Sequence, residues 1–180
     1  MDFDGLVDSY EKPIYNLALR VLGDADEAAD LTQETFLAAY KAWGSFRGES
    51  TAYTWLYRIA LNLCKNKFRE RDRRRHHEGL SLDEQSWPDQ NTTDTIKDRL
   101  EDTADTPAEA LQRKELKELI EQAISQLPPE YRVVVALRDL QGLSYADIAA
   151  AADLSVDVVR TRLARARNML RIRLSGYLSD

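Results

Sequence analysis

The chain has 180 residues, of which 43% are apolar and 31% charged, with a formal net charge of −6. This length and composition suit one or two small folded domains. There is no run of eighteen apolar residues, and the acidic N-terminus lacks a basic segment followed by an apolar one, so we expect neither a transmembrane helix nor a signal peptide. A single cysteine, Cys64, excludes an internal disulfide bond and a cysteine-rich zinc site. These features favour a cytoplasmic protein.

The charge is unevenly distributed along the chain. Residues 1–75 have a net charge of 0, residues 76–110 of −8 and residues 111–180 of +2. Within the flanks, residues 58–75 carry eight bases and two acids, and residues 160–173 carry six bases and no acid. Two basic segments therefore lie on either side of an acidic one. Local charge governs contact with phosphates, because salt screens distant charges.

Both flanks show helical periodicity, and no stretch of useful length alternates as a strand does. Residues 76–110 are rich in Asp, Glu, Thr and Ser and hold too few apolar residues to offset the entropy of an ordered chain. We predict an all-α fold of two small helical domains joined by an acidic flexible linker, with a short helix possible at Ile96–Leu100.

The first two predicted helices differ in their faces. Apolar residues recur at helical spacing from Leu6 to Leu22, and Gly23 ends this helix. The second helix, "DADEAADLTQETFLAAYKAW", has a predicted core face of Ala29, Thr32, Phe36, Ala39, Tyr40 and Trp43. Its opposite face comprises Glu27, Asp30, Leu31, Glu34 and Lys41. The simplest interpretation is a solvated acidic face, and a partner surface is the alternative, to which Leu31 among these acids is a hint.

The third predicted helix, "TAYTWLYRIALNLCKNKFRERDRRR", is apolar nearly all round in its first half. One interpretation is a central helix buried on two sides. The other is a surface for unstacked bases, since aromatic rings beside Arg58, Asn62 and Lys65 supply stacking and cations for single-stranded nucleic acid. The basic tail Arg69–Arg75 would extend the phosphate track.

The C-terminal flank predicts four helices. Pro107 stands near the start of the first, Pro128 and Pro129 in the first turn of the second, and Gly142 at its end. Ser144 caps a short third helix and forms a capping box with Asp147. A turn at Asp153–Leu154 and a new N-cap at Ser155 lead to a basic fourth helix, which is the helix-turn-helix pattern.

The last helix separates into two faces. The predicted buried stripe is Val156, Val159, Leu163, Ala166, Leu170 and Leu174. The opposite face includes Thr161, Arg162 and Arg165, which can reach base edges, with bidentate arginine on guanine as the strongest contact. A solvated basic helix is the alternative.

Four successive stretches resemble signatures of bacterial extracytoplasmic-function (ECF) sigma factors, in the order in which that family has them. They are "DADEAADLTQETFLAAYKAW", "SFRGESTAYTWLYRIALNLCKN", "LPPEYRVVVALRDLQGLSYADIAA" and "VVRTRLARAR". The resemblance implies sigma domain 2 in residues 1–75, which docks on core RNA polymerase and reads and melts the minus-10 element. It also implies a linker in residues 76–110 and sigma domain 4 in residues 111–180, which reads the minus-35 element.

The resemblance also implies three sets of contact residues. The polymerase-docking set is Glu27, Asp30, Leu31, Gln33 and Glu34. The minus-10 set is Phe46, Arg47, Ser50, Tyr53, Arg58, Asn62 and Lys65, of which Phe46, Tyr53 and Asn62 would bound a pocket for a flipped base, while Trp55 packs in the core. The minus-35 set is Arg160, Thr161, Arg162 and Arg165.

The implied partners are core RNA polymerase, promoter DNA and an anti-sigma factor, often membrane-anchored in this family. No small-molecule substrate, cofactor, metal or enzymatic activity is expected, because the polymerase carries the catalysis. A stand-alone helix-turn-helix regulator is the main alternative, but it needs neither a docking helix nor an aromatic strand-capture helix. A hydrolase or metal enzyme has little support, since His76 and His77 stand on a charged linker edge without partner residues.

Two positions depart from the family pattern. Ala152–Asp153 stands where Leu-Gly is usual, and aspartate tolerates the left-handed backbone of such a turn better than most residues. Asp157 adds a negative charge in the first turn of the last helix, where it suits the helix dipole but repels nearby phosphate. The minus-35 sequence preference is therefore the least predictable property.

The linker must be long enough to join two promoter contacts. Its 35 residues reach at most about 115 Å at roughly 3.3 Å each, which exceeds about thirty base pairs at roughly 3.4 Å each. It can therefore join two promoter contacts. We further hypothesise that, in the free protein, its acids fold back on the basic helices and weaken binding to naked DNA.

Overall fold

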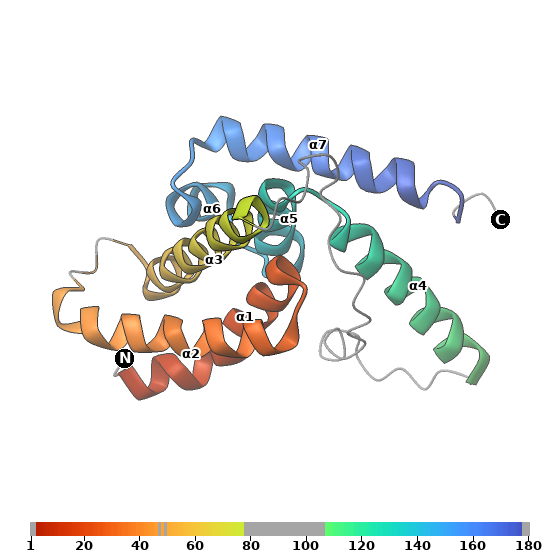
Figure 1. The fold of residues 1–180 in the computed structure, drawn as a ribbon. Helices are drawn as coiled ribbons and strands as arrows, with labels where there is room; N and C mark the ends of the chain where they lie inside the picture. The colour runs from red at the N-terminus through yellow and green to blue at the C-terminus, as the bar shows by residue number, and fades with distance from the viewer. Residues whose placement is uncertain (1–2, 47, 49, 78–106, 178–180) are drawn as a thin grey trace.

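Figure 1 shows the computed structural model of the chain, which describes residues 3–46, 48, 50–77 and 107–177. The described residues form helices joined by turns, and no strand occurs among them, which confirms the all-α prediction. No helix in these ranges combines the length and the apolar character needed to cross a bilayer. Most of the acidic segment, with the helix expected at Ile96–Leu100 and the proposed fold-back, lies outside the described residues.

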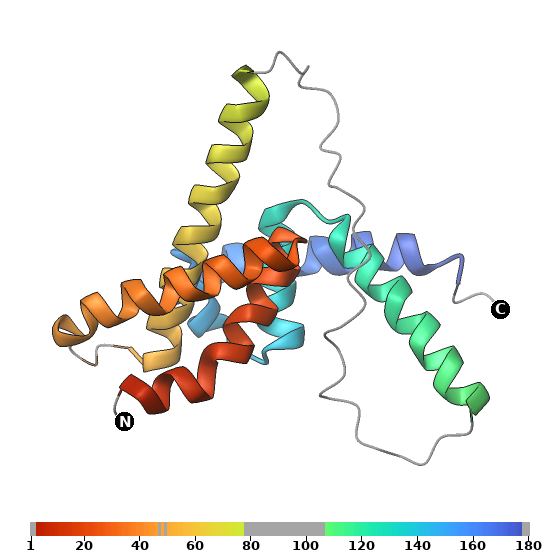
Figure 2. The same ribbon diagram turned by 60° about the horizontal axis from the view of Figure 1, so that its bottom comes forward.

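The N-terminal half consists of α1 (Phe3–Leu22), α2 (Ala25–Ala42), the short 3-10 turn η1 (Trp43–Ser45) and α3 (Ala52–His77). The first helix ends as predicted, because Gly23 takes a left-handed φ of 75°. Asp24 then caps α2, and its carboxylate accepts a 2.8 Å hydrogen bond from the amide of Glu27. The helices α1 and α2 pack side by side, and α3 packs across them (Figures 1 and 2).

The predicted core face of α2 is confirmed in part, because Thr32 and Ala39 are buried and Phe36 and Trp43 are half-buried against the core. The residues that α2 buries are Ala28, Leu31, Thr32, Thr35 and Ala39. Leu31, predicted to be exposed, has 0% exposure, while Ala29 and Tyr40, predicted to face the core, are exposed.

Threonine chemistry explains why Thr35 is buried beside the predicted Thr32. The hydroxyls of Thr32 and Thr35 donate 2.7 Å hydrogen bonds to the carbonyls of Ala28 and Leu31 in the preceding turn, so these polar residues are buried without an unmet donor. Small residues and threonines therefore form the packed face. The ring of Tyr40 lies at the edge of the domain, with its centroid 5.3 Å from that of Phe3.

The C-terminal half consists of α4 (Pro107–Ser125), α5 (Pro129–Val135), the π-helical turn η2 (Ala136–Leu140), α6 (Tyr145–Ala152) and α7 (Val156–Leu174). The single helix predicted up to Gly142 is therefore two elements, α5 and η2. Gly142 follows with a φ of 74°.

The predicted caps of the helix-turn-helix are confirmed. The Ser144 hydroxyl accepts a 3.1 Å bond from the amide of Asp147, and the Ser155 hydroxyl accepts a 3.3 Å bond from the amide of Val158. Asp153 closes α6 in the left-handed region, with φ 57° and ψ 54°. In the chain that the structure describes, it is the one residue other than glycine with a positive φ.

We expect Asp153→Gly to raise the free energy of unfolding by about 0.5–1 kcal/mol, because glycine adopts a positive φ without steric cost. The matched control is Ala152→Gly, one residue earlier in helical backbone, which should lower it by about 0.5–1 kcal/mol. Urea denaturation of both variants measures the difference. Two losses of equal size would show that the left-handed turn imposes no strain on Asp153.

The stripe of α7 residues that we predicted to be buried is confirmed at its centre, but the prediction is wrong at its first residue. Val159, Leu163 and Ala166 are buried, and Leu170 and Leu174 are half-buried. Val156, however, is 38% exposed.

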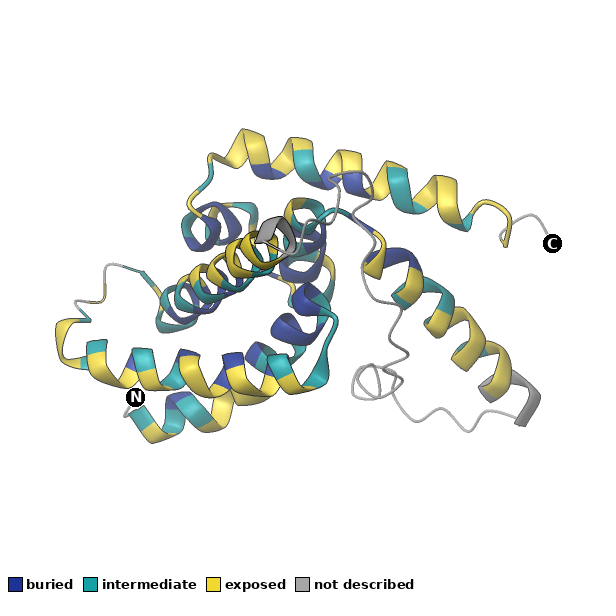
Figure 3. Ribbon diagram, viewed as in Figure 1, coloured by how far each residue is buried: buried dark blue, intermediate teal, exposed yellow. Residues whose placement is uncertain are grey.

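The two halves pack against each other through a shared core. The helix α3 contacts α1 and α2 on one side and α6 on the other, and α1 also contacts α5 (Figures 1 and 2). Figure 3 shows buried residues lining these facing surfaces, while exposed residues cover the outer faces of α2, α4 and α7.

Arg132 of α5 lies at this boundary with only 1% of its surface exposed. Its guanidinium donates to the carbonyls of Val21 in α1 at 3.2 Å and Leu127 at 2.9 Å, and also to the carbonyl of Ser125. Burial lowers the pKa of Arg132 to about 10. The side chain therefore remains charged at neutral pH and joins the end of α1 to the α4–α5 turn.

Candidate nucleic-acid interface

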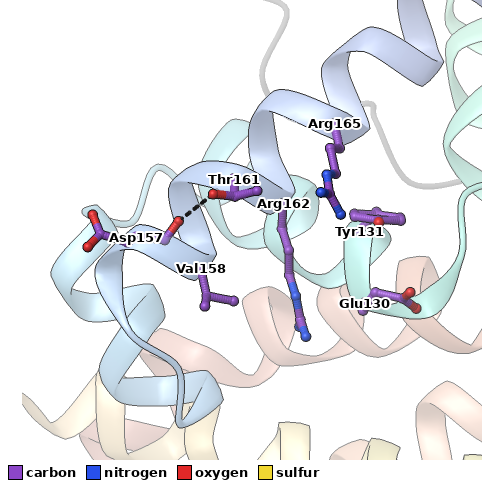
Figure 4. Close-up of a pocket in the computed structure, with 7 residues that line it drawn as sticks. All are labelled: Glu130, Tyr131, Asp157, Val158, Thr161, Arg162 and Arg165. Carbon is purple, nitrogen blue, oxygen red and sulfur yellow. Dashed lines mark hydrogen bonds between the residues drawn. The ribbon is translucent and has the colours of Figure 1, made fainter.

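The predicted minus-35 residues lie together on α7. Arg160, Thr161 and Arg165 are exposed, and Arg162 is half-buried. The Thr161 hydroxyl donates a 2.8 Å bond to the carbonyl of Asp157 (Figure 4). The hydroxyl proton of Thr161 is therefore already hydrogen-bonded within the helix.

Asp157 also pairs with a predicted DNA contact. The guanidinium of Arg160 lies 3.2 Å from its carboxylate, with the two side chains 66% and 88% exposed. An ion pair this exposed is weak, so phosphate can displace Asp157 from Arg160. The negative charge noted in the sequence therefore acts on one specific arginine.

An open hollow lies beside the basic face of α7, between it and the start of α5. It is lined by Glu130, Tyr131, Asp157, Val158, Thr161, Arg162 and Arg165. Figure 4 shows the side chains of Arg162 and Arg165 projecting from α7 towards α5, where Tyr131 and Glu130 stand. Sequence reasoning missed Glu130 and Tyr131, because only tertiary packing brings α5 beside α7.

Three of the predicted minus-10 residues, two of them cationic, project from one side of α3. Arg58, Asn62 and Lys65 are exposed residues of this helix. Two of them contact the other half of the molecule. Arg58 donates bonds of 3.0 and 2.8 Å to the carbonyl of Ala150, and Lys65 donates a 3.3 Å bond to the carbonyl of Ala152.

The predicted aromatic residues fall into two separate ring clusters. Phe46 stacks on Trp43 at 5.7 Å between ring centroids and lies 5.0 Å from Trp55, which is half-buried against the core. Tyr53 instead stacks on Tyr10 at 6.4 Å and meets Tyr57 edge-on at 6.2 Å. Ser50 is half-buried. Arg47 lies outside the described residues.

The predicted docking face of α2 holds Asp30, Gln33 and Glu34, all exposed. Glu27 forms an ion pair with Arg71 of α3 and is half-buried. The exposed apolar residue of this face is Leu37, at 55% exposure, rather than the buried Leu31. Helical spacing from Asp30, Gln33 and Glu34 would have identified Leu37, because positions three, four and seven apart share a face.

Cys64 is buried, and desolvation raises the pKa of its thiol to about 12. Such a thiol is unreactive at neutral pH, which disfavours redox sensing. The described residues hold no group of three or more histidine, cysteine or acidic side chains placed to bind a metal ion.

Comparison with known proteins connects this geometry to a family. Residues 6–74 match Sigma-70 region 2, and residues 117–170 match Sigma-70, region 4. The chain is 39% identical to RNA polymerase sigma-H factor of Pseudomonas aeruginosa over 99% of its own length and 89% of that protein's. The protein belongs to the extracytoplasmic-function sigma factors. It is also 38% identical to the ECF RNA polymerase sigma-E factor of Haemophilus influenzae, over 93% of this chain and 85% of that one.

The fold of this ECF sigma factor resembles that of a solved relative. The sigma factor RpoE of Bartonella quintana, in complex with the anti-sigma factor NepR, superposes with a TM-score of 0.72 at 22% identity, covering 97% of each chain. As an ECF sigma factor, the protein binds core RNA polymerase and directs promoter-specific transcription initiation. The two basic faces lie in the two matched regions.

Proposed function

We propose that this sigma factor docks on core polymerase through Asp30, Gln33 and Glu34 of α2, and that Leu37 adds the apolar contact. It reads the minus-35 duplex with α7. The observation that supports this division most directly is the face of exposed Thr161 and Arg165 and half-buried Arg162 on the second helix of a capped helix-turn-helix. Domain 2 spans residues 1–75, the linker residues 76–110 and domain 4 residues 111–180.

The minus-10 strand is captured by α3 and the preceding loop. Arg58 and Lys65 bind phosphates, Asn62 contacts a base, and Phe46 and Tyr53 offer aromatic surfaces from two ring clusters. Extruding a base costs a few kcal/mol, so shaped aromatic surfaces are needed in addition to charge. Ser50 and Arg47 complete this contact region.

The protein itself is no enzyme, since the polymerase supplies the catalysis, and it acts in the cytoplasm without a cofactor. An anti-sigma factor regulates it. The similarity in fold to a sigma factor solved with its anti-sigma factor supports this partner.

In vitro transcription with core polymerase and a promoter library tests the proposal. The expected result is initiation at a defined minus-35 and minus-10 pair, which the purified core alone does not use. Binding to core polymerase without initiation at any specific start site would overturn the proposal. Binding to duplex DNA with no effect of polymerase would support a stand-alone regulator instead.

Two alanine variants should distinguish the two promoter-reading elements, α7 for the minus-35 duplex and α3 for the minus-10 strand, which we call the two readers. We expect Arg165→Ala to weaken binding to minus-35 duplex by about 1–3 kcal/mol, since it removes an exposed guanidinium from α7. Asn62→Ala should leave that affinity unchanged and impair open-complex formation, measured by permanganate reactivity of unpaired thymines. Equal effects of the two variants on duplex binding would contradict this division.

A further inference from the structure

The face of α3 assigned to the minus-10 strand is in contact with the helix-turn-helix. Arg58 and Lys65 donate to Ala150 and Ala152 at the C-terminal end of α6, at 2.8–3.0 and 3.3 Å. One turn earlier on α3, the hydroxyl of Thr54 donates a 3.3 Å bond to the carboxylate of Asp147. The cations and the polar side chain of one reader therefore bind the other reader.

The groups that α6 presents are chemically suited to this role. The last four carbonyls of a helix lack partners within it, and the C-terminus carries the negative end of the helix dipole. The carbonyl of Ala149 accepts from the amides of the turn, at 2.9 Å from Leu154. The carbonyls of Ala150 and Ala152 accept from Arg58 and Lys65 instead. Together with Asp147 they offer α3 oxygen acceptors of the kind that a DNA strand offers.

Further bonds hold the two halves in register around this contact. The Tyr57 hydroxyl donates a 3.2 Å bond to Gln141, whose amide donates a 3.3 Å bond to the carbonyl of Pro13 in α1. At the far end of α1, Arg20 lies 3.1 Å from Glu121 of α4, with side chains only 12% and 17% exposed.

We propose that α6 is a binding surface for the minus-10 face of α3, so that in the free protein α6 and the promoter strand compete for Arg58 and Lys65. This inference rests on the proposed function of α3. The exposed face of α2 takes no part in the contact, so core polymerase can dock before the readers separate. The affinity of the free protein for single-stranded DNA is then its intrinsic affinity multiplied by the fraction of molecules in which the two halves are apart.

The Arg20–Glu121 pair gives a test that avoids every residue assigned to DNA or polymerase. Arg20→Glu and Glu121→Arg each place like charges together at the boundary and should favour separated halves by about tenfold. Both variants should increase the radius of gyration measured by small-angle scattering. Both should also bind a short fluorescent single-stranded DNA pool of random sequence up to about tenfold more tightly at fixed salt. The double variant Arg20→Glu with Glu121→Arg restores opposite charges at the boundary, so it should return the radius of gyration and the DNA affinity to those of the parent protein.

The design separates opening from net charge, because the two single variants change the protein's charge in opposite directions. A purely electrostatic effect would weaken DNA binding for Arg20→Glu and strengthen it for Glu121→Arg. The matched control is Glu118→Arg, the same change on α4 at an exposed pair with Lys114, 3.9 Å apart. It should leave the radius of gyration unchanged.

A second variant locks the contact. Arg20→Cys with Glu121→Cys, joined by a cleavable bifunctional maleimide, should lose about tenfold in affinity for the same DNA pool and regain it after reduction. Cys64 should not react, since it is buried. Unchanged scattering in both charge variants, or full DNA affinity in the locked protein, would overturn the inference even if transcription succeeds. Failed transcription with altered scattering would instead overturn the proposed function and leave the contact standing.

Discussion

Replacing Arg132 by alanine is expected to lower the free energy of unfolding by about 3–5 kcal/mol. Arg132 is 1% exposed, and its guanidinium donates to three backbone carbonyls, those of Val21, Ser125 and Leu127. Alanine removes the donors and leaves these carbonyls buried, and each lost bond to a charged group costs about 1.5–3 kcal/mol before the site relaxes. Urea denaturation followed by circular dichroism measures the loss.

The control for Arg132 is Arg171→Ala, an exposed arginine of α7, which should change stability by no more than about 0.5 kcal/mol. Arg132→Lys should recover part of the loss, because an ammonium group reaches fewer of the three carbonyls than the planar guanidinium does. A loss below about 1 kcal/mol for Arg132→Ala would mean that water enters the boundary and replaces the arginine.

Leu31→Ala and Leu37→Ala should have opposite consequences, although they are the same change on the same helix. Leu31 is fully buried, so its truncation should cost about 2–5 kcal/mol of stability. Leu37 is 55% exposed, so its truncation should leave stability within about 0.5 kcal/mol. It should instead weaken binding to core polymerase by about 1–2 kcal/mol, the loss expected of a residue whose side chain becomes buried at the centre of an interface.

Thermal melts and a polymerase-binding titration measure the two effects. Assayed well below its melting temperature, Leu31→Ala should bind polymerase as the parent protein does. Normal polymerase affinity for Leu37→Ala would remove Leu37 from the docking face. It would leave that contact to Asp30, Gln33 and Glu34.

The helix-turn-helix shows which structural features can be predicted from residues close together in the sequence. Ser144, Asp147 and Ser155 are capping residues whose bonds lie within one turn, so their geometry follows from chain-local chemistry, and the structure confirms it. The left-handed turn at Asp153 is local in the same sense, because its backbone follows from where α6 must stop. The family resemblance likewise rested on ordered local motifs, which the relatives confirm over almost the whole chain.

The orientation of α2 was not determined locally. Its sequence allows two faces about one residue apart, one richer in aromatic rings and one built from alanine, leucine and threonine. The choice depends on how α1 and α3 approach, because small residues and self-bonded threonines permit tight helix packing, while Phe36 and Trp43 stay half-buried against the core. Leu31 is buried rather than exposed for this reason, and Leu37 is an exposed leucine of the same helix.

The sequence by itself determined the all-α fold, the caps, the basic faces and the membership of the sigma family, because each depends on residues close together in the chain or on their order. Only the tertiary structure decided that Arg132 joins α1 to the α4–α5 turn, that Glu130 and Tyr131 stand beside α7, and that α6 contacts the face of α3 that we propose captures the minus-10 strand. These contacts join residues that are far apart in the sequence. Their partners are backbone carbonyls and packed surfaces, which carry no pattern that a sequence can display.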